Sequence, residues 1–396
     1  MSDLPTGWRQ YEFGELFDVQ GGSQPAKKHF VYEPQDGYIR LLQIRDFGAK
    51  PVPTYVPRHM VTKFCTETDI LIARYGASLG RILSGMSGAY NVALAKVILD
   101  ENITDRQFVL YWLNRPQFQH SLQSISRSAQ SGFNKDDIFP ILVHLPPLPE
   151  QVKIAGILHT WDRAIALAER RIEAALQRKR SLMQRLLTGR VRFLEFKGDA
   201  WKEARLEYVF TRVRRRNTRG TPNILSITAN VGFEHQSEKF GRVIAGKNLS
   251  KYTLLKRGEF AYNKGNSLSY PQGCVYLLEE YDEAAVPNVY YCFGVESEAV
   301  HAPFYKYYFE SGALNAQLMR VINTGVRNDG LLNLSADDFF NCQIAVPPLA
   351  EQRRIAAVMQ SCDRELELLR KKRGALQCQK KGLMQRLLTG RVRVSV

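Results

Sequence analysis

The chain has 396 residues, of which 44% are hydrophobic and 11% aromatic, and it carries a formal net charge of +16 at pH 7. This length exceeds what one hydrophobic core usually covers, so at least two folded domains are expected. The sequence contains neither an apolar run of roughly 18 residues nor an N-terminal secretory signal, so we expect a cytoplasmic protein without a membrane span. The basic charge favours a polyanionic partner such as nucleic acid, because clustered Lys and Arg side chains release its condensed counterions.

Residues 1–145 predict a mixed α/β domain that opens near Trp8. Short apolar runs that end in turns predict strands at 38–44, 69–73 and 90–98, and helical spacing predicts a helix at 105–114. That helix carries three aromatic residues at core-like spacing, which we interpret as buried rather than base-stacking. They are Phe108, Tyr111 and Trp112.

Polar residues in loops are the candidate DNA contacts of this first half, because specific contacts usually lie in loops on a rigid scaffold. The glycine-rich loop at 21–28 joins small residues to an amide and two cations, and other candidates follow predicted strands. Arg45 could equally form an ion pair with Asp46. The candidates are Ser23, Gln24, Lys27, Lys28, Gln43, Arg45, Arg74 and Tyr75.

The next segment predicts a long helix. Pro146 and Pro147 precede it, and Gly189 can take the left-handed conformation that ends a helix. Between them, apolar residues from Ile154 to Leu186 recur in alternating steps of four and three, which is the heptad spacing of a coiled coil. At about 1.5 Å per residue, a helix from about 150 to about 187 is on the order of 55 Å long.

The same unit then occurs a second time. The string LMQRLLTGRVR begins at positions 182 and 383, and a Pro-Pro-Leu-x-Glu-Gln motif begins at 146 and 347, so both pairs are 201 residues apart. Trp201 opens this second half, and Phe304, Tyr307 and Tyr308 repeat the aromatic spacing. Strands are expected at 224–228, 259–263, 273–278 and 289–295, with a helix at 302–311 and a second long helix ending before Gly390.

The run 212–219 is the main DNA-binding candidate of the second half. Guanidinium groups bind phosphates or the O6 and N7 atoms of guanine, and an Asn side chain suits adenine. The alternative interpretation is a solvated basic loop. The candidates in this half are Arg212, Arg214, Arg215, Arg216, Asn217, Lys264 and Asn266.

Motifs for catalysis are weak or missing. Residues 241–248 almost match a phosphate-binding loop, but Asn248 stands where Ser or Thr should hold magnesium. Six cysteines form no Cys-x-x-Cys pair, and no methyl-transfer or nuclease motif is recognisable. We therefore expect a chain that is not itself an enzyme and that has no cofactor or metal site of its own.

The repeat predicts an α+β fold class, with two tandem mixed α/β domains separated by two long helices that form an antiparallel, pseudo-twofold coiled coil. The alternative is that each helix packs along its own domain. Lys179, Lys380 and Arg373 occupy seam positions, which suggests extra faces for partner helices. The expected segments are 1–145, 146–193, 194–346 and 347–396.

These features resemble the specificity (S) subunits of Type I restriction–modification systems. The resemblance rests on the Pro-Pro-Leu-x-Glu-Gln starts, the ends at 183–192 and 384–393, the long helix between them, and the opening Trp8 and Trp201. It implies that each globular half is a target recognition domain that reads one part of a bipartite double-stranded DNA sequence. It also implies a coiled coil that sets the half-site spacing and docks two modification subunits.

By the same resemblance, S-adenosylmethionine and adenine-N6 methyl transfer belong to the modification subunits. ATP, Mg and DNA translocation and cleavage belong to restriction subunits. Two other classes remain open: a DNA methyltransferase or nuclease with divergent motifs, and a purely structural coiled-coil scaffold.

Overall fold

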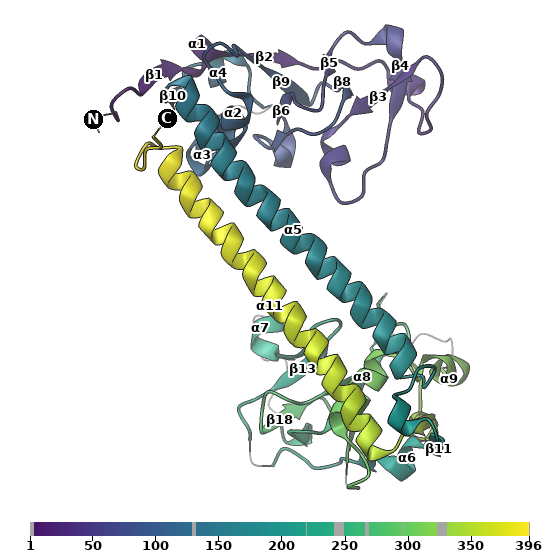
Figure 1. Cartoon of the computed structure of the whole chain (residues 1–396). Coiled ribbons are helices and arrows are strands. Elements are labelled where there is room, and N and C mark those ends of the chain that lie inside the picture. Colours follow the sequence, from purple (N-terminus) through teal and green to yellow (C-terminus); the bar gives the residue numbers. More distant parts are fainter. Residues whose placement is uncertain are drawn as a thin grey trace. The chain divides into compact units, whose positions relative to one another are not determined.

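The computed structural model describes residues 4–128, 132–218, 220–240, 249–265, 269–295, 297–322 and 331–395. The chain forms two compact units. The first comprises Met1–Glu169 and Lys371–Val396, and the second comprises Arg170–Arg370. Each unit therefore combines one globular half with a part of both long helices (Figure 1).

The two long helices are α5 (Leu148–Leu186) and α11 (Leu349–Leu387), each of 39 residues. Both predicted helices are confirmed, and their first residues differ by the same 201 positions as the sequence motifs. Gly189 and Gly390 follow with φ of +69° and +71°, the left-handed conformation that closes a helix at low steric cost.

Within each unit the two helices run antiparallel. In the first unit, Ile154 and Leu158 near the start of α5 share a core with Leu387, the last residue of α11, and with Leu388, which follows it. In the second unit, Met183 and Leu186 near the end of α5 share a core with Ile355 and Met359 near the start of α11. The antiparallel coiled coil is thus confirmed, and the heptad seam is the contact surface.

The first unit holds two four-stranded sheets and a two-stranded one. Their strand orders are β2-β9-β6-β7, β4-β3-β8-β5 and β1-β10. The strands are β1 (Arg9–Glu12), β2 (Phe17–Gly21), β3 (Tyr38–Leu42), β4 (Tyr55–Pro57), β5 (Phe64–Cys65), β6 (Ile70–Ala73), β7 (Ile82–Leu83), β8 (Gly88–Tyr90), β9 (Leu94–Leu99) and β10 (Leu142–Leu145). The shorter helices are α1 (Phe13–Leu16), α2 (Arg106–Leu113), α3 (Pro116–Ser128) and α4 (Lys135–Ile138).

The second unit repeats one four-stranded sheet, β12-β19-β16-β17, and the two-stranded sheet, β11-β20, and it has β13-β14 and β15-β18 as separate pairs. Its strands are β11 (Lys202–Arg205), β12 (Thr211–Arg212), β13 (Leu225–Thr228), β14 (Gly232–His235), β15 (Thr253–Lys256), β16 (Phe260–Asn263), β17 (Cys274–Leu277), β18 (Glu283–Val286), β19 (Tyr291–Gly294) and β20 (Gln343–Val346). Its shorter helices are α6 (Leu206–Val209), α7 (Gln236–Phe240), α8 (Ala302–Glu310), α9 (Asn315–Val321) and α10 (Ala336–Phe340). The order β12-β19-β16-β17 matches β2-β9-β6-β7 strand for strand, which confirms the α+β repeat.

One predicted strand is wrong. The apolar run at 90–98 contains two strands, because β8 ends at Tyr90 and β9 begins at Leu94. A turn separates them, in which the backbone N–H of Leu94 donates to the carbonyl of Asn91 over 3.0 Å. The aromatic residues predicted as core on α2 and α8 are all buried.

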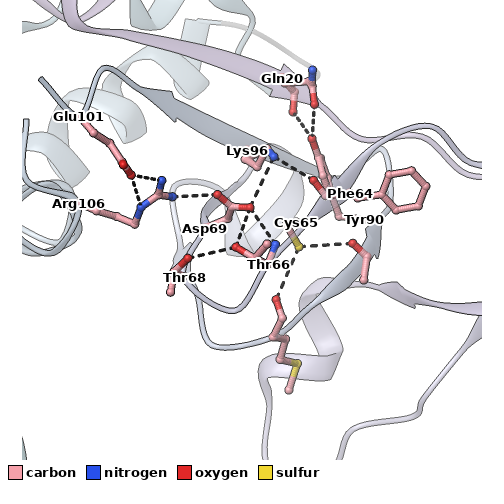
Figure 2. A network of polar contacts seen from close by, with 12 residues as sticks. Gln20, Phe64, Cys65, Thr66, Thr68, Asp69, Tyr90, Lys96, Glu101 and Arg106 are labelled. Carbon is pink, nitrogen blue, oxygen red and sulfur yellow. Dashed lines mark hydrogen bonds and ion pairs between the residues drawn. The ribbon is translucent and has the colours of Figure 1, made fainter.

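A polar network joins the two four-stranded sheets of the first unit to α2 (Figure 2). The Asp69 carboxylate lies 2.8 Å from Arg106 and 3.5 Å from Lys96, and Lys96 donates to the Phe64 carbonyl over 2.9 Å. Burial alone would raise the pKa of Asp69, but these cations and Thr66 outweigh it and lower the pKa. The network therefore fixes β5, β6, β9 and α2 as one rigid scaffold.

Two glycines lie inside α11, where glycine stabilises a helix less than alanine does. An added Cβ at Gly374 or Gly382 would meet no atom within 4 Å, so alanine fits at both positions. We expect Gly374→Ala and Gly382→Ala each to raise the free energy of unfolding by about 1 kcal/mol, because alanine loses less backbone entropy in a helix. Chemical denaturation measures this. Gly189→Ala is the contrast: its φ is +69° and its Cβ would lie 3.4 Å from Trp201, so we expect it to destabilise.

Candidate nucleic-acid interface

Three strands of the first unit end beside one short segment, residues 91–94. The backbone N–H of Gly22, which follows β2, donates to Leu94 over 2.9 Å, and that of Arg74, which follows β6, donates to Ala93 over 2.9 Å. Asn91 donates from its backbone to the last carbonyl of β3 over 3.0 Å. The loops that follow β2, β3 and β6 therefore meet at one edge, and most first-half candidates lie in them.

Close backbone packing brings the loop at 21–28 against Arg74. A Cβ on Gly21 would lie 2.9 Å from the Arg74 guanidinium, and one on Gly22 would lie 2.2 Å from the Asn91 carbonyl, so neither position accepts a larger residue without movement. Arg74 also lies over the ring of Tyr75, 5.2 Å from its centroid. The structure thus places Ser23 and Gln24 in the same edge as Arg74 and Tyr75, whereas Lys27 and Lys28 are exposed on the following turn.

Gln43 and Arg45 share an unexpected partner. Both donate to the hydroxyl oxygen of the buried Thr54, over 3.1 and 3.0 Å respectively. Asp46 pairs instead with Arg40 at 3.2 Å, so the alternative pairing of Arg45 with Asp46 is wrong. Arg45 is exposed, and its hydrogen bond to Thr54 holds its side chain in place. This arrangement suits a residue that presents its guanidinium to a ligand.

The four arginines at 212–216 in the second unit differ in whether they bind a carboxylate. Arg212 donates to Asp337 over 2.8 Å and lies over the Phe340 ring, and Arg215 binds the carboxylate of Glu259. Arg214 and Arg216 are exposed, and within the described residues neither makes an ion pair with a carboxylate. Among the described arginines of the run, these two are therefore the ones that remain available to phosphate.

The prediction that Asn217 contacts DNA is wrong. Its side chain is buried, and its amide oxygen accepts a hydrogen bond from the backbone of Thr221 over 3.0 Å. Asn217 shapes a turn and is not available to a base edge. Lys264 lies over the Tyr291 ring, 5.2 Å from the centroid, while Asn266 and the phosphate-loop-like segment 241–248 lie outside the described residues.

The repeated Glu-Gln motifs have a structural role that sequence reasoning missed. The Glu150 carboxylate binds Arg393 through two hydrogen bonds of 2.8 Å, and Glu351 binds Arg192 through bonds of 2.9 and 2.6 Å. Gln151 caps the start of α2 by accepting from the backbone of Asp105 over 2.9 Å. Each helix start is thereby fixed to the segment that follows the end of the other helix.

Comparison with known proteins identifies a known domain in the first half and similar full-length chains. Residues 5–178 match the model of the Type I restriction modification DNA specificity domain, and the internal repeat carries the same helix motifs through the second half. The Type I restriction enzyme MjaVIII specificity subunit of Methanocaldococcus jannaschii is 25% identical over 99% of this chain and 94% of its own length. The first half of this chain thus carries the domain of Type I specificity subunits, and the chain is similar to such subunits over nearly its whole length. A putative MjaX specificity subunit from the same organism is 23% identical over 100% of the chain and 96% of that protein.

Solved specificity subunits share the fold. An S subunit from M. genitalium aligns with a TM-score of 0.56 at 17% identity, covering 98% of this chain and 97% of that one. A chain from a study of type I complex assembly and conformational transition aligns with a TM-score of 0.61 at 16% identity, covering 99% and 100%. None of the helices in the described part of the chain has the length and the apolar character that a membrane span requires.

The two lysines of the heptad seam, Lys179 and Lys380, each form an ion pair with an aspartate of the other long helix. Lys380 lies 2.5 Å from Asp162, which also accepts from the Tyr111 hydroxyl over 2.6 Å. Lys179 lies 2.8 Å from Asp363, which accepts from Tyr307 in the same way. The suggestion that these two lysines mark faces for further helices is therefore not needed, because they join each helix pair to α2 or α8.

Glu150 should make the stability of the chain sensitive to acid. Burial alone would raise its pKa, but the hydrogen bonds and charge of Arg393 outweigh burial and lower it. A lowered pKa in the folded state stabilises the fold above the unfolded value, about 4.3, and this contribution is lost as pH falls through the folded pKa. We expect Glu150→Gln to lower Tm by several degrees at neutral pH and by progressively less below about pH 4. Thermal unfolding from pH 7 to 3 measures this; a constant difference would contradict it.

Proposed function

We propose that this chain is the DNA-reading subunit of a Type I restriction–modification complex. Residues 1–145 and 194–346 would be its two target recognition domains, and the helical regions 146–193 and 347–396 would hold them at a set spacing. The observation that supports this is one four-stranded sheet that occurs in both halves with the same strand order, while the loops at the strand ends differ in sequence. Two different recognition domains joined by one pair of long helices suit a bipartite DNA sequence whose halves differ.

The first reader would use Ser23, Gln24, Gln43, Arg45, Arg74 and Tyr75 at its strand-end edge, with Lys27 and Lys28 on the phosphates. The second would use Arg214 and Arg216 on phosphates, with Lys264 near the end of β16. Arg212 and Arg215 would act mainly by holding this loop, because both already bind carboxylates. Arginine is suited to either role through its planar set of donors.

The complex would divide the chemistry among its subunits. Two modification subunits would carry S-adenosylmethionine and transfer the methyl group to adenine N6, and restriction subunits would use ATP and Mg to translocate and cleave DNA. The chain itself would bind double-stranded DNA in the cytoplasm and catalyse no step. Purified alone, it should transfer no methyl group from S-adenosylmethionine; turnover by the isolated chain would favour the methyltransferase alternative.

Mapping of N6-methyladenine tests the proposal directly. The chain and its modification subunit are expressed in a host without adenine methylation, and the genomic DNA is sequenced for modified bases. The expected result is one bipartite motif with a fixed unspecified spacer, absent when this chain is omitted. A motif that persists without the chain, or one without two separated halves, would overturn the proposal.

A further inference from the structure

The hairpin of β13 and β14 ends in a tip with an unusual backbone. Asn230 has a φ of +65°, and among the described residues it is the one non-glycine in the left-handed region. Asn tolerates this conformation better than most residues, but it is still uncommon outside glycine. Val231 beside it is 62% exposed, so the tip presents an amide and an apolar side chain together to solvent.

The tip is held in one conformation. The backbone N–H of Asn230 donates to the Tyr276 hydroxyl over 3.1 Å, and its side-chain amide donates to Ser269 over 3.3 Å. Val231 donates from its backbone to Thr228 over 3.2 Å. Within the described residues, nothing donates to the side-chain oxygen of Asn230. A left-handed residue held this firmly and still exposed is typical of a functional position.

The tip of the β13–β14 hairpin has a counterpart in the first unit. β14 pairs antiparallel with β13, as β4 does with β3, and a parallel bridge from Ile224 to Ala285 repeats the parallel pairing of β3 with β8. The tip therefore corresponds to the β3–β4 connection, which carries Gln43 and Arg45. Asn263, the last residue of β16, donates to the Ile227 carbonyl over 3.4 Å and so ties β13 to the same strand-end edge.

We propose that Asn230 and Val231 read an A·T base pair in the major groove of the half-site bound by the second domain. A two-stranded β-ribbon fits this groove, the Asn amide matches N6 and N7 of adenine, and the Val methyl groups match the C5 methyl of thymine. The inference rests on the proposed function. It also supplies the adenine-reading Asn that sequence analysis had placed at Asn217, which is buried.

Two substitutions separate the two contacts while preserving the fold. Asn230→Gly removes the amide and keeps the left-handed backbone, which glycine adopts freely. Val231→Ala removes the methyl groups from an exposed side chain. Met319→Ala is the matched control, because it shortens an apolar side chain that is 66% exposed on α9. Each variant is assayed as the full chain with its modification subunit, and thermal unfolding verifies that it is folded.

The assay measures methylation of a DNA library in which both half-sites are randomised. The wild type should prefer A·T at one position of one half-site, and Asn230→Gly should reduce that preference about tenfold or more, since a good bidentate contact discriminates to that degree. Val231→Ala should weaken the same position, whereas the other half-site and Met319→Ala should be unchanged.

The methylation assay distinguishes failure of this inference from failure of the proposed function. If the wild type shows a bipartite motif and both tip variants keep every preference, the hairpin does not read bases. If the preference that is lost is for G·C, the assigned contact is wrong. If the wild type methylates without any preference, the proposed function itself fails.

Discussion

Inserting seven residues into both long helices, after Glu169 in α5 and after Arg370 in α11, is expected to reduce methylation of the native motif more than tenfold. One heptad adds about 10 Å of helix and keeps the seam in register. That length equals about three base pairs at about 3.4 Å each, which turns the second half-site by roughly a quarter of a helical turn or more. Motif sequencing measures the change, and any motif that remains should have a longer spacer.

The same insertion in α5 alone provides the contrast. The pair of Lys380 with Asp162 lies on one side of the insertion point, and the pair of Lys179 with Asp363 lies on the other. A single insertion cannot keep both pairs in register with two straight helices, so we expect a lower Tm as well as loss of the native motif. The double insertion should keep the wild-type helix content by circular dichroism. Native-motif methylation at the wild-type rate in either variant would show that helix length does not set the spacing.

The long helices could be predicted closely because their signals are local. Proline and glycine mark the ends, and the heptad pattern needs only neighbouring residues, so the expected span of about 150–187 is close to the observed Leu148–Leu186. The break between β8 and β9 had no such signal. It depends on the pairing of β8 with β3 and β5, which are distant in the sequence.

The candidate site was harder to predict because side-chain partners are distant along the chain. The arginine run was visible, but Glu259 and Asp337, which bind Arg215 and Arg212, lie 44 and 125 residues away. The recurrence of Asp162 and Asp363 at the same offset as Lys179 and Lys380 could have indicated the seam pairs. No sequence pattern indicated Asn230, because its left-handed backbone depends on the hairpin around it.

Replacing Arg214 and Arg216 together with alanine is expected to weaken DNA binding about tenfold or more at physiological salt. Both side chains are exposed, so each is free to neutralise a phosphate and release a counterion. Two lost contacts should reduce the slope of log affinity against log salt by about two, uniformly across DNA sequences. Titrations of DNA with the chain between 50 and 200 mM salt are the appropriate measurement.

Arg215→Ala is the matched control for this pair of substitutions. Its guanidinium already binds the Glu259 carboxylate, so its charge is largely balanced within the protein and its removal should change the salt slope less. Equal slopes for the wild type and the double variant would make Arg214 and Arg216 a solvated basic loop. A decrease in the slope of about one with Arg215→Ala alone would instead show that DNA displaces Glu259, because only a freed guanidinium could contribute a phosphate contact.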